Sequence, residues 1–402
     1  MKRGVFCFIL ALFAGVSAPA VDFGLVLNSE AEYVSDTEGE GFGFTETLTP
    51  WFSASLGKTM SLYLSGKASF EYEYDTGDWK RPPLFEIDRT ELGFHPVRTV
   101  YLNLGRQRFR DSGGMIASGL FDGLSGAFSL GRARFSLGAY YTGLLYRETA
   151  NILMTADDLD SYGRPLDYGD PDTYFAPRRV LLPLDIEFPD LASRLSLALG
   201  LLAQIDANDD PARYTQYAET RLGLDAADTL RFVLTAIGAL TKKEDEDPRA
   251  HLAAAFGADW DLPGSLPDML TAEFRWGSGE TGDSAGAFTP VNDIAQGTVF
   301  TPNLRGLMNT RAVYTARPHR ILSLSAEAVL FWRTDLETFR DLELDGASKD
   351  RFLGTEAVVS LIAAPQSAFR LTAGGGAFFP GGAFAEDAGV RWKINMGVIL
   401  SL

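Results

Sequence analysis

Charged side chains recur at every second position inside several apolar segments of this 402-residue chain. Such pairs are Asp185 with Glu187, Glu219 with Arg221, Glu273 with Arg275, and Arg391 with Lys393. Side chains at alternate positions of a β-strand point to the same face of the sheet. Carboxylates and guanidinium groups that share a face can attract, repel and orient charged solutes. Alternatively, they pair with one another and only keep the wall of a cavity wetted.

Position along each expected strand assigns a set of charged residues to this polar face. The basic candidates are Lys67, Arg221, Arg231, Arg275, Arg311, Arg333, Arg370, Arg391 and Lys393. The acidic candidates are Glu71, Glu73, Asp185, Glu187, Glu219, Glu273, Glu327 and Glu356. If the strands enclose a lumen, these residues are predicted to line it.

The sequence predicts neither an enzyme nor a bound cofactor or metal. Nucleophilic catalysis usually needs a base beside a Ser or Thr, and none of the three histidines, His95, His251 and His319, has such a setting. An acidic-dyad hydrolase would need only loop carboxylates and remains an alternative. No glycine-rich phosphate loop or His/Cys cluster is present. The spacing of Asp167, Asp170 and Asp172 does not match a dedicated Ca²⁺ loop.

The segment MSLYLSGKASFEYEY, residues 60–74, alternates strictly between two kinds of side chain. Even positions are apolar or glycine and end in aromatics, whereas odd positions carry mostly hydroxyls and charges. The same alternation recurs to the end of the chain, where Val390, Trp392, Ile394, Met396, Val398, Leu400 and Leu402 share one face. Counting these segments predicts about 18 strands, each long enough to cross a bilayer at a tilt.

The connections between the expected strands alternate between two lengths. The short turns are placed at residues 56–59, 95–98, 131–134, 189–192, 226–228, 263–265, 317–319 and 364–366. The long, acidic loops are placed at 75–83, 110–119, 147–177, 206–213, 242–249, 278–305 and 334–351. This asymmetry is typical of outer-membrane barrels, with short periplasmic turns and long extracellular loops. The longest loop, 147–177, either constricts the lumen or forms a solvated surface loop.

The N-terminus has the pattern of a secretory signal peptide, predicted to be cleaved after Ala20. Lys2 and Arg3 precede an apolar core, and Ala18 and Ala20 occupy the cleavage-site positions. The single cysteine, Cys7, lies within that core, so the mature chain has neither a disulfide nor a lipidation cysteine. Removing two basic residues changes the formal net charge from -17 to -19, which argues against a nucleic-acid partner.

These patterns predict an all-β transmembrane, antiparallel, up-and-down β-barrel formed by residues 21–402. Only closed barrels leave no unpaired strand edge in lipid, so the apolar face is expected to contact outer-membrane lipid. Aromatic residues near strand ends, namely Trp51, Tyr72, Tyr74, Trp260, Trp276, Trp332 and Trp392, are expected to form interfacial girdles. The C-terminal segment resembles the strand that barrel assembly machinery recognises.

The segment LGRQRFRDSGGMIASGLFDGLSGAF, residues 104–128, carries a family resemblance. Gly105, Arg106 and Gln107 close one strand, and Phe121, Asp122 and Gly123 open the next. This resembles the alginate-export family of outer-membrane porins and related 18-stranded porins, in which a G-R-Q strand end precedes an F-D-G strand. From the residues alone, Gly105 could occupy a bulge and Asp122 could cap a turn.

The resemblance implies a passive channel for small polar solutes or ions, such as sugars or uronates. Alginate exporters have a strongly basic pore, whereas this chain is acidic and its predicted wall carries both signs. A polysaccharide exporter is therefore one alternative. A surface-exposed structural or adhesive barrel with a plugged lumen is the other.

Overall fold

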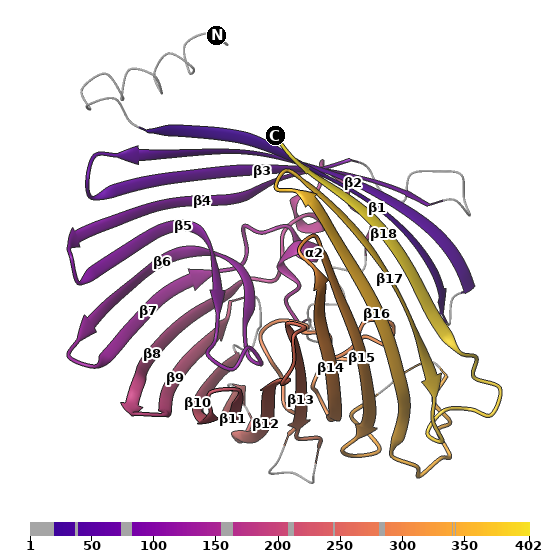
Figure 1. Ribbon diagram of the computed structural model, residues 1–402. Helices are drawn as coiled ribbons and strands as arrows, with labels where there is room; N and C mark the ends of the chain where they lie inside the picture. Colours follow the sequence, from indigo (N-terminus) through magenta and orange to yellow (C-terminus); the bar gives the residue numbers. More distant parts are fainter. Residues whose placement is uncertain are drawn as a thin grey trace.

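The strands of this protein close into a single barrel (Figure 1). The computed structural model describes residues 20–36, 39–73, 83–153, 164–207, 213–243, 246–280, 286–339, 341 and 343–402. Its strands are β1 (Val21–Asp36), β2 (Gly39–Leu56), β3 (Met60–Glu73), β4 (Leu84–Val97), β5 (Val100–Arg110), β6 (Ser118–Leu130), β7 (Ala133–Tyr141), β8 (Arg179–Ala192), β9 (Leu195–Asp206), β10 (Arg213–Ala227), β11 (Leu230–Lys243), β12 (Arg249–Asp261), β13 (Asp268–Gly277), β14 (Leu307–His319), β15 (Leu322–Arg333), β16 (Phe352–Gln366), β17 (Phe369–Pro380) and β18 (Arg391–Ser401).

Each strand pairs antiparallel with the next strand in the sequence, and β1 also pairs with β18. The resulting 18-stranded sheet confirms the predicted fold class and strand number. The predicted signal peptide lies outside the described residues except for Ala20, so its cleavage stays a prediction.

The alternation read from the sequence separates the two faces of the wall. On β3, Leu64 is exposed on the outer surface, whereas the neighbouring Ser65 is buried and donates a hydrogen bond to Asp88 at 2.8 Å. On β18, Ile394 and Met396 are exposed on the outer surface, whereas Lys393 points inward and pairs with Glu32. The barrel is therefore apolar outside and polar inside, which is the reverse of the arrangement in a soluble β-sandwich.

Interfacial girdles require outward-facing aromatics, a condition that Trp392 meets and Trp51 does not; Tyr74 lies outside the described residues. Trp392 lies on the outer face and stacks on Tyr33, with ring centroids 5.0 Å apart. Trp51 instead stands opposite Ser65 on the interior face and stacks on Tyr63. Trp51 follows Pro50, and position parity rather than closeness to a strand end decides its face.

Short and long connections gather at opposite ends of the barrel. The predicted turns at 189–192, 317–319 and 364–366 are wrong in position, because β8, β14 and β16 run to Ala192, His319 and Gln366 and the turns follow these residues. A register shift between Phe188 and Ala192 accommodates Pro189 within the strand. The connection from 381 to 390 also lies at the long-loop end and was missing from the predicted set. The predicted loop 75–83 falls outside the described residues except for Pro83.

Parts of three long loops fill the interior at the long-loop end. The short helix α2 (Arg147–Ala150) and the 3-10 turn η1 (Pro171–Thr173) belong to the loop after β7, and Figure 1 shows α2 inside the ring of strands. No helix within the described part of the chain is long and apolar enough to cross a bilayer.

Candidate pore constriction

The predicted G-R-Q segment marks the place where one hairpin leaves the barrel wall. Gly105 adopts φ +119°, and a Cβ there would lie within 1.8 Å of the Thr90 carbonyl oxygen. Glycine is therefore required at this irregular position. Pairing between β4 and β5 stops at Thr90 and Arg106, and pairing between β6 and β7 stops at Asp122 and Tyr141. Beyond these points the hairpin from Arg106 to Asp122, named here the constriction hairpin, has no strand beside it among the described residues.

The tip of the constriction hairpin crosses the interior to the wall formed by β10 and β11. The Asp111 carboxylate accepts hydrogen bonds from the amides of Met115, Ile116 and Ala117 and so fixes the tip. Burial nevertheless raises the pKa of Asp111, because desolvation outweighs these hydrogen bonds. A Cβ on Gly113 would lie 2.2 Å from Glu219 Oε1 and 2.8 Å from Thr235 Cγ2. The tip therefore packs directly against β10 and β11.

Two further loops hold the tip in place. The Val291 amide donates to the Ile116 carbonyl at 2.7 Å, and the Ser118 amide donates to Asn292 Oδ1 at 2.9 Å. Asn292 in turn donates to the Ala150 carbonyl at 2.9 Å. An apolar core joins these loops to the wall; it includes Met115, Ile116, Phe121, Leu145, Ile152, Leu181, Leu202, Tyr217, Phe288, Val291 and Leu304. The described part of the predicted loop 147–177 thus packs partly inside the barrel.

A cavity of about 240 Å³ remains between the constriction hairpin and the wall formed by β7 and β8. Arg108 and Arg110 line its hairpin side, and Asp185 and Glu187 line its wall side. Tyr101, Ser125, Ser136 and Tyr140 add hydroxyl groups. A small solute at this point would contact both signs of charge and several hydroxyls, which is how narrow pores select among polar solutes.

The acidic side of the interior extends beyond this cavity. Asp185 on β8 and Glu219 on β10 stand on either side of Gly200 on β9. A Cβ on Gly200 would lie 3.1 Å from Asp185 Oδ1 and 3.4 Å from Glu219 Oε2. The glycine leaves room for two carboxylates to converge, and their mutual repulsion favours a cation between them.

Arg108 and Arg110 were absent from the predicted interior set. The alternation of Arg106, Arg108 and Arg110 is visible in the sequence. Strand register is continuous through Gly105, so parity places these even positions on the outward face of Leu102 and Leu104. Arg108 and Arg110 lie inside the barrel because the hairpin leaves the wall beyond Arg106.

Eight of the predicted interior charges lie in ion pairs along the wall. The pairs are Lys67 with Glu86 at 4.0 Å, Arg231 with Asp225 at 3.6 Å, Glu187 with Arg134 at 3.6 Å, Glu273 with Arg275 at 3.0 Å, Arg311 with Glu327 at 2.9 Å, and Lys393 with Glu32 at 2.7 Å. By strand register, Glu71, Glu73, Arg221 and Arg370 also occupy interior positions. The partners Glu32, Glu86, Arg134 and Asp225 were not predicted.

Three predicted residues are buried beneath loops. Arg333 donates to the carbonyls of Ser348 and Asp350, and Arg391 binds the carboxylates of Asp341 and Glu343. Glu356 is fully buried and accepts the amides of Thr298, Val299 and Phe300. These side chains hold loops against the inner wall rather than facing open lumen.

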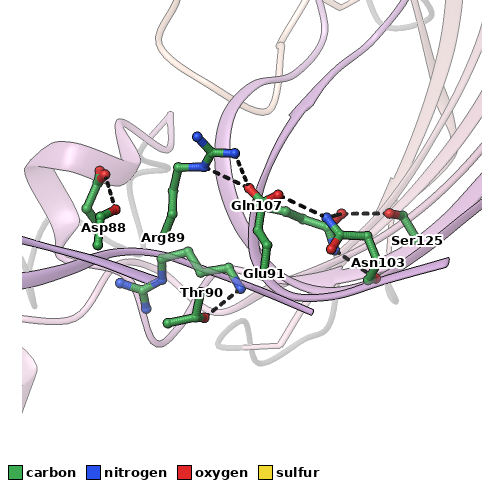
Figure 2. Close-up of polar contacts among 9 residues, drawn as sticks. Asp88, Arg89, Thr90, Glu91, Asn103, Gln107 and Ser125 are labelled. Carbon is green, nitrogen blue, oxygen red and sulfur yellow. Dashed lines mark hydrogen bonds and ion pairs between the residues drawn. The ribbon is translucent and has the colours of Figure 1, made fainter. Parts of the chain in front are cut away.

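The remaining motif residues form a polar network at the root of the constriction hairpin. Arg106 makes two hydrogen bonds to Asp122, at 3.0 and 2.9 Å. Figure 2 shows Gln107 between Asn103 and Ser125, with Arg89 and Glu91 beside them; Asn103 donates to Gln107 at 2.9 Å and Ser125 donates to it at 2.6 Å. Asp122 thus pairs with an arginine and does not cap a turn. Phe121 packs in the interior core, and a Cβ on Gly123 would meet the Ala139 carbonyl.

The loop carboxylates considered for Ca²⁺ serve the loop's own geometry. Asp167 accepts the Gly169 amide, and Asp170 accepts the Asp172 amide and pairs with Arg164. Across the residues with described positions, no group of three or more His, Cys, Asp or Glu side chains is arranged to hold a metal ion.

Neither the protein-family models nor the curated proteins include a match to this chain. Several solved outer-membrane channels are similar in structure. OpdO of Pseudomonas aeruginosa has a TM-score of 0.63 and 12% identity, over 96% of this chain and 98% of that chain. OccK2 (OpdF) of the same organism, solved with glucuronate, has a TM-score of 0.60 and 12% identity, over 95% and 98%. OprD has a TM-score of 0.57 and 9% identity, over 95% and 93%.

These comparisons define the fold class as the 18-stranded barrel of outer-membrane porins. At such low identity the likeness concerns the fold alone. The reported structures are OprD and Occ channels, so the finer resemblance to the alginate-export family rests on the G-R-Q and F-D-G segments only.

Proposed function

We propose that this protein is an outer-membrane channel for passive diffusion of small polar solutes. The observation that supports this most strongly is a closed barrel that contains a cavity lined by Arg108 and Arg110 on one side and Asp185 and Glu187 on the other. The exposed apolar exterior fits lipid as its surroundings.

The chemistry of the cavity supports solutes that combine hydroxyl groups with charge. Guanidinium groups can bind a carboxylate, while carboxylates and hydroxyls accept and donate hydrogen bonds to sugar hydroxyls. Sugars and uronates have these groups, and one similar structure was solved with glucuronate. Export of a polyanion such as alginate is less well supported, because Asp185, Glu187 and Glu219 would repel it.

Liposome swelling tests this solute class. Vesicles containing the refolded protein should swell faster in glucuronate and neutral monosaccharides than in polymers too large for a 240 Å³ cavity. Protein-free vesicles are the control. Equal, protein-independent swelling in every solute would contradict the proposed function.

A plugged barrel with an adhesive or structural role is the second candidate. The apolar core that joins three loops inside the barrel favours it, since such packing resists displacement. Removing residues 112–116 at the hairpin tip distinguishes the two. A plugged barrel should begin to conduct, whereas an open channel should change mainly in selectivity.

Location and partners follow from the same proposal. The N-terminal signal, cleaved after Ala20, would direct the chain to the periplasm, and the C-terminal strand β18 would engage the barrel assembly machinery. We infer transport rather than catalysis because the interior charges line a wall in pairs. His95 packs on Tyr101 and His319 lies beside a short turn, whereas His251 lies near the opposite end.

A further inference from the structure

One stretch of the barrel wall is closed by side chains instead of a neighbouring strand. Residues Leu84–Arg89 of β4 pair with β3 along one edge. Pairing with β5 begins only at Thr90. Because the constriction hairpin turns inward here, no described strand covers the other edge of Leu84–Arg89.

Two tyrosines and one arginine bind four backbone groups of this edge. The Tyr168 hydroxyl donates to the Pro83 carbonyl at 2.7 Å and accepts the Phe85 amide at 3.1 Å. The Tyr174 hydroxyl donates to the Phe85 carbonyl at 3.1 Å. Arg106 Nη1 donates to the Ile87 carbonyl at 2.5 Å. Together these groups take the place of the missing strand.

The edge lies within the apolar band of the outer surface. Phe85 stands in a cross-strand row with Ala68, Leu48, Leu27 and Leu400. Phe85 and Ile87 are 62% and 58% exposed. Unpaired backbone groups at this depth would face hydrocarbon, where no water can replace the hydrogen bond.

Arg106 connects this edge to the constriction hairpin. Its guanidinium binds Asp122 through two hydrogen bonds, the Ile87 carbonyl and the Leu144 carbonyl, and its own amide donates to Thr90 Oγ1. The side chain is almost completely buried. A lysine could not make these contacts at once, because an ammonium lacks the planar fork of a guanidinium.

We propose that Arg106, with Tyr168 and Tyr174, seals the wall at the root of the constriction hairpin and thereby positions the hairpin in the lumen. Arg106 is a positioning residue, since it acts through the hairpin that carries Arg108 and Arg110. The conductance readout below rests on the proposed channel function, whereas the cross-linking readout does not.

The Tyr174 hydroxyl remains a donor near neutral pH. Burial raises the pKa of Tyr174 to about 12, so its phenol stays protonated. Tyr146 packs on Tyr174 with ring centroids 5.1 Å apart, which fixes the direction of the ring.

The first experiment records single channels of Arg106→Gln, Arg106→Lys and the Tyr168→Phe/Tyr174→Phe double variant. Arg106→Gln should lose the single steady conductance level and fluctuate among several levels, and Arg106→Lys should do so less. The double variant keeps Arg106 and removes only the phenol hydrogen bonds, so it should fold and still fluctuate. Matched controls are Arg320→Gln at an exposed turn and Tyr214→Phe on the outer wall, which should behave as wild type.

A second experiment reads the hairpin position by disulfide formation. A Cβ on Gly113 would lie 2.8 Å from Thr235 Cγ2, so the Cβ atoms at 113 and 235 would come within about 4.5 Å, a distance that permits a disulfide. The mature chain has no other cysteine. The G113C/T235C pair should cross-link in high yield, and adding Arg106→Gln should reduce that yield several-fold.

The cross-link also provides a rescue. Oxidised G113C/T235C should restore a single steady level to Arg106→Gln channels, and reduction should remove it. The proposal would be overturned if Arg106→Gln channels kept a single steady conductance level, as in the wild type, and if the G113C/T235C pair cross-linked as fully with Arg106→Gln as without it. Absence of conductance in the wild type would overturn the channel function instead, while the cross-linking yield would still decide the role of Arg106.

Discussion

At the scale of single residues, Gly105 is the position on which the constriction depends. Its φ of +119° lies in a region that other residues seldom adopt, and the Thr90 carbonyl occupies the space of a Cβ. Gly39 also has positive φ, +127°, but no atom lies within 4 Å of its would-be Cβ. The two glycines therefore separate backbone strain from steric collision.

Gly105→Ala should destabilise the folded barrel by more than the roughly 1–3 kcal/mol typical of a strained backbone position. Gly39→Ala should cost no more than this typical amount. Thermal unfolding of the refolded proteins in detergent measures both. Equal stability of the two variants would contradict the collision with Thr90.

The charges of the acidic wall give a second prediction at this scale. Asp185→Asn together with Glu219→Gln removes two negative charges beside the cavity, so the channel's preference for cations should fall. Reversal potential under a salt gradient measures this preference. Asp228→Asn, an exposed carboxylate at a short turn, is the matched control, and an equal effect from it would refute a local role for the pair.

At the scale of elements, loops and strands play separate parts. The wall carries paired charges, while the inward loops occupy part of the barrel interior. A few buried polar side chains hold these loops against the wall. Glu356 is the clearest anchor, because three consecutive amides of the loop between β13 and β14 donate to its carboxylate.

Glu356→Ala should release that loop. Three amides would lose their acceptor, and the buried one, at Phe300, would cost about 1–3 kcal/mol if left unsatisfied. Hydrogen exchange at Thr298, Val299 and Phe300 should accelerate strongly, and Glu356→Gln should show a smaller effect because it keeps one acceptor oxygen. Unchanged exchange in Glu356→Ala would show that apolar packing alone holds the loop.

The sequence predicts the wall much better than the constriction. Alternation sets the face of each strand, so interior positions such as Lys67, Glu327 and Lys393 follow from parity. The inward turn at Gly105 does not follow, because it depends on the close approach of Thr90, which lies fifteen positions earlier in the sequence. The sequence also does not predict that loops bury Arg333, Arg391 and Glu356, because loop conformation leaves no periodic pattern in the sequence.

At the scale of the whole molecule, charge and shape act together. The formal net charge is -17, or -19 without Lys2 and Arg3, so the field of the molecule favours cations near its entrances. Arg108 and Arg110 oppose this at the cavity, where they would bind an anionic group beside the carboxylate wall. Raising the salt concentration should weaken cation preference, since distant charges are screened beyond about 10 Å at 0.1 M.

The central claim, an open channel with a charged constriction, is tested most directly by one recording. Refolded residues 21–402 are inserted into a planar bilayer, and single-channel conductance and reversal potential are measured under a KCl gradient. We expect steady conductance steps with a preference for cations. A correctly folded barrel that inserts but carries no current would contradict the claim and favour the plugged barrel.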